Sequence, residues 1–238
     1  MNRLYCKSYS GDVSSTPSSW YEYGQQASSP SVQNGIGRLI NAWTQRASAG
    51  SCPVITTGLT SAPAAGSFLS LRAISSYDPM GRITSEQQYT PANIASGTPY
   101  LPQYSYDLAG NLAYSTDGIT PNPTPTVQLP SCSVQAPSWM TSALLTFANC
   151  YDGAGRLQTM ASNWSVPNSV LTQSLFSAAS YYAFGGLGTA FFGNNALTLN
   201  RTYDNRLRIT TELDTGSTVG TAISGSATVT FTGAEQSK

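Results

Sequence analysis

The sequence contains no histidine, and charged residues make up only 9% of its 238 positions. Without histidine, the chain cannot form a Ser-His-Asp triad, a Cys-His pair or a His-Glu-x-x-His zinc site. The formal net charge is zero, whereas a face that binds nucleic-acid phosphates needs clustered Lys and Arg. We therefore expect no enzyme activity, no cofactor, no metal site and no nucleic-acid partner.

Long hydrophobic runs are also lacking, which argues against a membrane-spanning segment. Residues 1–7 contain no continuous apolar stretch of the kind that a signal peptide requires. This absence leaves two readings of the cellular location. Either the chain stays inside the cell, or it is part of a longer secreted protein.

Cysteine is scarce. The four cysteines are Cys6, Cys52, Cys132 and Cys150, and no two of them form a Cys-x-x-Cys pair. The spacing therefore does not suggest a zinc site. We expect buried or free thiols. The alternative is one disulfide in an exported chain, with Cys132 and Cys150 as the candidate pair.

The residues that are abundant favour an all-β protein. There are 14 Tyr, 21 Gly and 14 Pro, a mixture typical of short strands joined by turns. Residues 197–203 alternate apolar and polar side chains, as a half-buried strand does. Residues 118–137 are rich in proline and indicate a long surface loop.

A seven-residue pattern recurs along the chain: an aromatic or polar residue, Asp or Asn, two variable residues, Gly, Arg or Asn, and an aliphatic residue. Copies occupy residues 33–39, 77–83, 106–112 and 151–157, and a shortened fifth copy at 203–207 lacks the Gly. The motif residues are Asn34, Gly37, Arg38, Tyr77, Asp78, Gly81, Arg82, Tyr106, Asp107, Gly110, Asn111, Tyr151, Asp152, Gly155, Arg156, Tyr203, Asp204 and Arg206.

Each copy has the chemistry of a hairpin turn. Asp or Asn at the first turn position accepts backbone N–H bonds, and the Gly supplies a residue with positive φ, as in a type I turn followed by a bulge. We predict positive φ at Gly81, Gly110 and Gly155. The motif Asp residues are expected to be structural, neither catalytic nor calcium ligands. Arg82 is placed to pair with Asp78 across the tip.

This reiterated motif resembles the YD repeats of bacterial Rhs proteins and of teneurins, over roughly residues 20–213. Residues 34–39 and 184–187 look like further copies. The resemblance implies a long β-sheet that spirals into a hollow shell, which in toxin-bearing members encloses a C-terminal effector and ends in an Asp-Pro-rich segment that cleaves the effector free. Here the single Asp-Pro, Asp78-Pro79, lies inside an ordinary repeat, so self-cleavage and toxin activity are not carried over.

The expected organisation has three parts. Residues 1–19 form an N-terminal segment without a clear pattern. Residues 20–213 form tandem YD-repeat hairpins within a twisted, spiralling β-sheet, an open fragment of an Rhs-type shell. Residues 214–238 form a Gly-, Ser- and Thr-rich tail, in which residues 227–232 alternate as the first strand of a truncated β-module.

The leading functional hypothesis is a non-enzymatic structural or encapsulating segment of a secreted or cell-surface Rhs-type protein. Its partners would be flanking repeats or further copies of itself. The alternative is an adhesive surface that binds a glycan or a cell-surface protein. For such contact the tryptophans outside the motif, Trp20, Trp43, Trp139 and Trp164, are the candidates, whereas the motif tyrosines are expected to pack. Asn163 begins a glycosylation sequon, read as a chance match.

Overall fold

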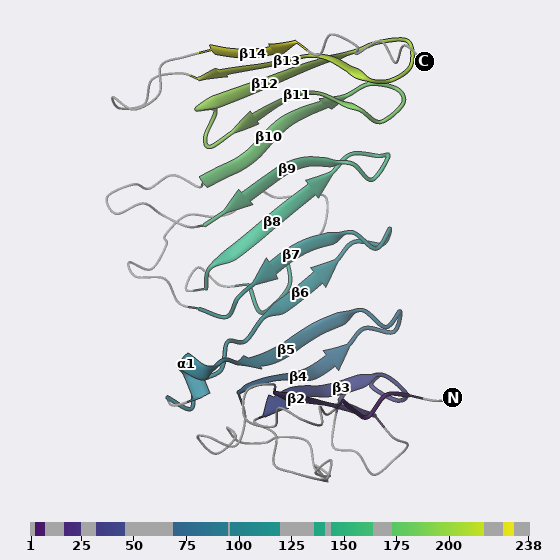
Figure 1. Ribbon diagram of the computed structural model, residues 1–238, viewed down its shortest axis with the longest axis vertical. Coiled ribbons are helices and arrows are strands. Elements are labelled where there is room, and N and C mark those ends of the chain that lie inside the picture. Colours follow the sequence, from purple (N-terminus) through teal and green to yellow (C-terminus); the bar gives the residue numbers. More distant parts are fainter. Residues whose placement is uncertain are drawn as a thin grey trace. The chain divides into compact units, whose positions relative to one another are not determined.

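The computed structural model describes residues 3–7, 17–24, 32–45, 69–94, 96–119, 136–140, 144–163, 173–216 and 226–230. The chain divides into two compact units. Unit 1 comprises Met1–Tyr104 and Thr116–Ile119, and unit 2 comprises Ser105–Ser115 and Thr120–Lys238. Both units consist of antiparallel β-strands joined in sequence order (Figure 1), so the predicted all-β fold built from hairpins is confirmed.

Unit 1 is a sheet with one short helix at its end. Its strands are β1 (Cys6–Lys7), β2 (Ser18–Tyr23), β3 (Leu39–Gln45), β4 (Ser70–Tyr77) and β5 (Ile83–Tyr89), each paired antiparallel with the next. Helix α1 (Pro91–Ile94) follows β5, and β6 (Gln103–Tyr106) then begins with Gln103 opposite Ser85.

The core of unit 1 is a row of side chains that crosses the sheet. Trp20, Trp43, Leu71 and Tyr89 stand opposite one another on successive strands, and each is at most 4% exposed. The two indole rings are stacked, with centroids 6.2 Å apart. Strand alternation places the row on one face, where Ile94 of α1 also packs. Trp20 and Trp43, two of the candidates for ligand contact, are therefore buried side chains of this row.

Unit 2 holds the remaining strands. These are β7 (Leu112–Thr116), most of which lies in this unit, β8 (Thr146–Tyr151), β9 (Leu157–Ser162), β10 (Gln173–Tyr181), β11 (Leu187–Phe192), β12 (Leu197–Tyr203), β13 (Ile209–Gly216) and β14 (Ser226–Thr230). From β8 to β14, each strand pairs antiparallel with the next. Strand β14 pairs along β13 from Thr211–Thr230 to Thr215–Ser226, so this part of the tail continues the sheet of unit 2.

Unit 2 also has a cluster of buried side chains. Ala113, Tyr114 and Ala148 form a buried cluster against which Trp139 and Met140 pack. Trp139 is thus partly buried, and Trp164 lies outside the described residues. In the next pair of strands, Ala161 stands opposite Ala148 and is also buried.

The cysteines depart from the leading expectation. Cys6 in β1 and Cys150 in β8 are both disulfide-bonded, so the free-thiol reading is wrong for these two residues. Cys52 and Cys132 lie outside the described residues. The pairing of Cys132 with Cys150 therefore remains a prediction.

Among the described residues, no helix has the length and apolar character needed to cross a membrane.

Candidate functional site

The repeat turns are the sites that the sequence singles out, and they have the predicted hairpin geometry. In the turn between β4 and β5, the Gly81 N–H donates to the Asp78 carbonyl and the Asp78 N–H donates to the Arg82 carbonyl, both at 2.9 Å. Gly81 has φ of 86°, and Gly110 and Gly155 have 96° and 75°. The prediction of positive φ at these three glycines is confirmed.

Five of the turns are preceded by a shift in strand register, as expected of a β-bulge. The shift falls immediately before the aromatic residue that ends the incoming strand. It occurs before Tyr23, Tyr77, Tyr151, Tyr181 and Tyr203. The bulge and the positive-φ residue therefore occur together in these five hairpins.

The motif aspartate binds the sixth motif residue of its own turn twice. Asp78 accepts the Arg82 backbone N–H at Oδ1 (2.8 Å) and the guanidinium Nε at Oδ2 (2.6 Å). Asp152 and Arg156 are joined by the same pair of bonds, as are Asp204 and Arg208. Asp107 likewise accepts the Asn111 backbone N–H at Oδ1 and the Asn111 side-chain amide nitrogen at Oδ2. Both carboxylate oxygens are therefore engaged inside the turn, which makes these residues local clamps.

These bonds lower the pKa of all four carboxyls, those of Asp78, Asp107, Asp152 and Asp204. At Asp78, desolvation would by itself raise the pKa, but the hydrogen bonds and charge of Arg82 outweigh it. At Asp152, the side-chain hydrogen bond from Arg156 is the main cause of the lowering. The carboxylates are thus held in the ionised form, which is the form that accepts these bonds.

The motif tyrosine connects one repeat to the repeat before it. Its hydroxyl donates to the backbone carbonyl of the aliphatic residue that begins the outgoing strand of the preceding repeat. The observed pairs are Tyr77 with Leu39, Tyr151 with Leu112 (3.1 Å), Tyr181 with Leu157 (2.5 Å) and Tyr203 with Leu187 (3.0 Å). Packing alone was expected from the sequence, so this hydrogen bond is the feature that sequence reasoning missed.

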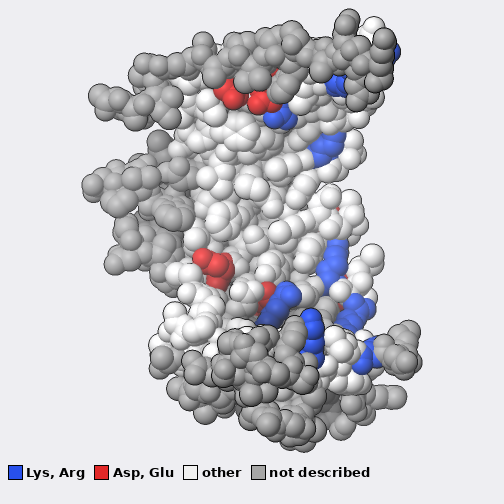
Figure 2. Space-filling model, viewed as in Figure 1, with Lys and Arg blue, Asp and Glu red and all other residues white. Residues whose placement is uncertain are grey.

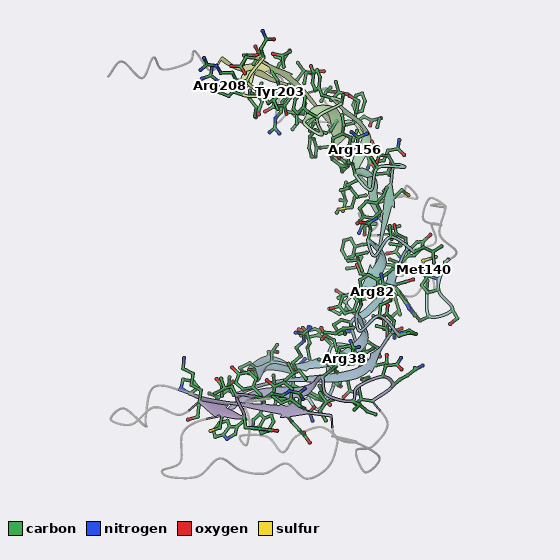
Figure 3. The ribbon with its side chains drawn as sticks, turned by 90° about the vertical axis from the view of Figure 1, so that its right-hand side faces the viewer. Arg38, Arg82, Met140, Arg156, Tyr203 and Arg208 are labelled. Carbon is green, nitrogen blue, oxygen red and sulfur yellow. The ribbon has the colours of Figure 1, made fainter. Side chains whose placement is uncertain are left out.

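The motif arginine also contacts the following repeat. The Arg38 guanidinium lies over the Tyr77 ring at 5.4 Å, and that of Arg156 lies over the Tyr181 ring at 4.7 Å. Figure 3 labels Arg38 in unit 1 and Arg156 in unit 2. Figure 2 shows blue side chains within each unit, amid mostly uncharged surface on the visible face. Arg156 therefore binds its own Asp and the next Tyr at once.

The first copy of the motif is split, which corrects the sequence reading. Gly24 donates to the Arg38 carbonyl (2.8 Å) and accepts from the Gly37 N–H (2.7 Å), the two bonds that an aspartate makes in the regular turns. Tyr23 stands opposite Leu39. Tyr23-Gly24 and Gly37-Arg38-Leu39 therefore form the turn, with residues 25–36 inserted between them.

Asn34, which was assigned to the aspartate position, lies in this insertion. It has φ of 56° and donates from its side chain to the Tyr77 carbonyl at 2.9 Å. The neighbouring Gln33 carbonyl accepts the Tyr77 N–H, also at 2.9 Å. Gln33 and Asn34 thus bond the end of β4 instead of closing a hairpin. The assignment of Asn34 to the aspartate position of the motif is therefore wrong.

The last copy is not shortened. Leu207 takes the glycine position with φ of 64°, and its N–H donates to the Asp204 carbonyl at 2.9 Å. Arg208 then binds the Asp204 carboxylate through its backbone N–H and Nε. Arg206 lies at the tip, so Arg208 and not Arg206 is the motif arginine. An alignment that required Gly could not find this register.

A sixth turn, at residues 181–187, replaces the charged pair with aromatic rings. Tyr182 and Gly185 make the two backbone bonds of the turn, at 2.9 Å each, and Gly186 stands in the arginine position. The Phe184 ring packs edge-to-face on Tyr203, with centroids 5.0 Å apart. A Cβ on Gly186 would lie 2.4 Å from that ring. Any larger residue at this position would therefore displace the Phe184 ring, which takes the place of the arginine contact.

Asn163, the first residue of the sequon, is buried and hydrogen-bonded within the fold. Asn163 is 3% exposed. Its side-chain oxygen accepts the Thr146 N–H at 2.8 Å, and its side-chain nitrogen donates to the Leu144 carbonyl at 2.7 Å. In the folded state this amide is not accessible to a modifying enzyme.

Comparisons with known proteins bear on the fold. No family model matches the chain, and no curated protein matches it. The crystal structure of TcdB2-TccC3 is similar, with a TM-score of 0.50 and 12% identity over 82% of this chain and 8% of that one. The Photorhabdus luminescens Tc holotoxin pore with a mutated TccC3 has a TM-score of 0.44 and 11% identity, over 83% of this chain and 9% of that one. The crystal structure of TcdB2-TccC3-Cdc42 has a TM-score of 0.43 and 13% identity, over 83% of this chain and 9% of that one. The chain thus spans under a tenth of these neighbours, and the likeness to TcdB2-TccC3 supports an Rhs-like β-fold.

Proposed function

We propose that the chain is a structural segment of an Rhs-type repeat shell, without enzyme activity of its own. The observation that carries this proposal is the use made of the motif residues. The motif contains carboxylates, guanidinium groups and phenols, which are the groups that could act in catalysis. In this chain they close turns or join consecutive repeats. Their arrangement supports a wall of hairpins rather than a reactive centre.

Flanking repeats are the proposed partners. Four motif tyrosines donate to the carbonyl of a preceding repeat, and the motif arginines Arg38 and Arg156 lie over the tyrosine of the following one. A repeat of this kind completes its bonding only between two neighbours. The similarity in fold to TcdB2-TccC3 supports placing the segment in the shell of a toxin component.

An extracellular or cell-surface location is part of the proposal. The disulfide bonds at Cys6 and Cys150 support it, because disulfides persist mainly in oxidising compartments. Fractionation of the source cells, with an antibody raised against the purified chain, tests the location. A signal confined to the cytosol would contradict it.

The structural role predicts no turnover by the purified chain. We would assay ester, peptide, glycoside and phosphodiester substrates and follow the intact mass on standing, with the wild type and with Asp152→Asn. No product and no fragments are expected from either protein. Turnover or self-cleavage that disappears in Asp152→Asn would overturn the proposal, because it would give a motif carboxylate a chemical role.

A further inference from the structure

A hollow of about 370 Å³ lies over β2 to β5. Most of the residues that line it alternate along the strands with the tryptophan row of unit 1, and Trp43, Leu71 and Tyr89 of that row also contribute to its lining. One cross-strand row explains its shape. Tyr21, Ala42, Arg72 and Gln88 stand opposite one another on the four strands, so the small Ala42 is flanked by two large side chains. In the adjoining row, Ser19, Thr44 and Ser70 are also small. The hollow is therefore a floor of small residues between Tyr21 and Arg72.

Glu86 holds the polar side chains at one end of the hollow in place. Glu86 is buried, with its side chain 1% exposed, whereas that of Arg72 is 45% exposed. Glu86 accepts Arg72 Nε at 2.5 Å, Gln88 Nε2 at 2.7 Å and the Tyr104 hydroxyl at 3.0 Å. Arg72 and Gln88 are thus oriented before any ligand arrives, which lowers the entropy cost of binding.

These groups define the chemistry of a fitting ligand. Beyond Nε, the Arg72 guanidinium carries further N–H donors, and the Gln88 side-chain oxygen is an acceptor. Thr44 and Ser70 bring hydroxyls that lie 2.7 Å apart. Glu86 balances the charge of Arg72, so the hollow has no excess charge to attract an anion. Tyr21 adds an aromatic ring with a polar tip, which suits a ligand that is both apolar and hydroxylated.

We propose that this hollow binds a neutral pyranose ring of a glycan. The C–H face of the sugar lies against Tyr21, and its hydroxyls bond Arg72, Gln88 and the Thr44–Ser70 pair. The volume is at the small end of the roughly 300–1,000 Å³ of ligand sites, which suits one or two sugar rings. The structural role of the repeats does not require this site, so the two proposals stand or fall separately.

Saturation-transfer NMR on the purified chain tests the site with methyl glucoside, methyl galactoside, methyl mannoside and N-acetylglucosamine as probes. Ala42→Phe fills the floor and is expected to abolish the signal. Tyr21→Ala removes the ring and should weaken binding by about three- to tenfold. Tyr182→Ala is the matched control, since it removes a tyrosine of unit 2 that is 40% exposed and far along the chain from the hollow.

Circular dichroism and thermal melting establish that each variant is folded, and Ser70→Phe replaces Ala42→Phe if the latter does not fold. Loss of signal in the filled variant, with Tyr182→Ala unaffected, supports the site. Three results would overturn it: no transfer to any of the four sugars, binding that survives the filled floor, or binding of glucuronate without binding of methyl glucoside.

Discussion

The aspartate and the tyrosine of each repeat act over different distances along the chain. Asp152 binds Arg156, four residues away, so its role follows from local turn chemistry. Tyr181 donates to the carbonyl of Leu157, 24 residues earlier, and so joins two hairpins. The phenol ring has a packing role that phenylalanine would share. The hydroxyl is what ties the ring to the preceding repeat.

Removing the Tyr181 hydroxyl tests the contribution of its hydrogen bond to Leu157. Tyr181→Phe should lower the free energy of unfolding by about 0.5–1.5 kcal/mol, because the Leu157 carbonyl loses its donor while the ring is kept. Urea denaturation followed by circular dichroism measures the change. Tyr5→Phe, at a tyrosine that is 57% exposed, is the control and should change stability by less than about 0.5 kcal/mol. Equal losses in the two variants would contradict a specific role for the hydroxyl.

The motif carboxyls predict a dependence of stability on acid. Their folded pKa values lie below the ordinary value of 3.8, so the unfolded chain binds protons more readily than the folded one. Their stabilisation is complete well above pH 3.8 and is lost as the pH falls through the lowered folded values. The melting temperature should therefore fall as the pH is lowered from about 6 to about 2.

The control for acid sensitivity is Asp152→Asn. The amide keeps a carbonyl oxygen for the backbone N–H but has no charge to titrate. This variant should be less stable than the wild type at neutral pH and should lose less stability on acidification. An unchanged acid profile would mean that other carboxyls govern it.

At the scale of the hairpin, the fifth motif residue decides how easily the turn closes. It has positive φ in every regular turn, and Leu207 is the single exception to glycine among them. Gly185 has φ of 94°, and a Cβ added there would meet no atom within 4 Å. The two positions therefore isolate backbone strain from crowding.

Exchanging the residues gives a reciprocal prediction. Gly185→Leu should destabilise the chain by roughly 1–2 kcal/mol, the cost of the left-handed conformation for a residue with a side chain. Leu207→Gly relieves that cost but adds entropy to the unfolded chain, so its expected effect is a gain of at most about 1 kcal/mol. Differential scanning calorimetry on both variants checks the signs. A stabilising Gly185→Leu would contradict the assignment of strain to φ.

The sequence predicted the features that depend on adjacent residues and missed those that depend on residues far apart in the chain. The turns at Asp78, Asp107 and Asp152 were found because their geometry depends on adjacent residues. The split first turn was missed because an insertion separates Gly24 from Gly37. The burial of Trp20 and Trp43 was missed because it depends on strand register, which the sequence around either residue does not specify.

The same limit explains the candidate sites. A hollow such as that over Ala42 comes from four strands that place a small residue between two large ones, and no segment of sequence contains that row. The hydroxyl bonds of the tyrosines likewise join residues of different repeats. Both features became visible only when the pairing of the strands was known.

At the scale of each unit, the two described end strands differ in what they offer to another strand. In unit 1, β1 has two residues, one of them Lys7, and Cys6 is fixed by a disulfide. A short, charged edge resists further pairing. In unit 2, β14 pairs with β13 and with no other described strand, and its sequence, Ser-Ala-Thr-Val-Thr, carries no charge or proline. Such an edge favours association.

We therefore expect the purified chain to self-associate through β14. Analytical ultracentrifugation at micromolar concentrations should show a sedimentation coefficient that rises with concentration. The double variant Thr228→Lys with Val229→Lys should shift the population toward monomer, because lysine on an edge strand opposes pairing whichever face each side chain occupies. Ala154→Lys, at an exposed turn tip, adds charge away from the edge and should leave association unchanged. A wild-type chain that stays monomeric at all concentrations would show that the edge of β14 is not available for pairing. If all the lysine variants shifted the population toward monomer equally, charge and not the strand edge would control association.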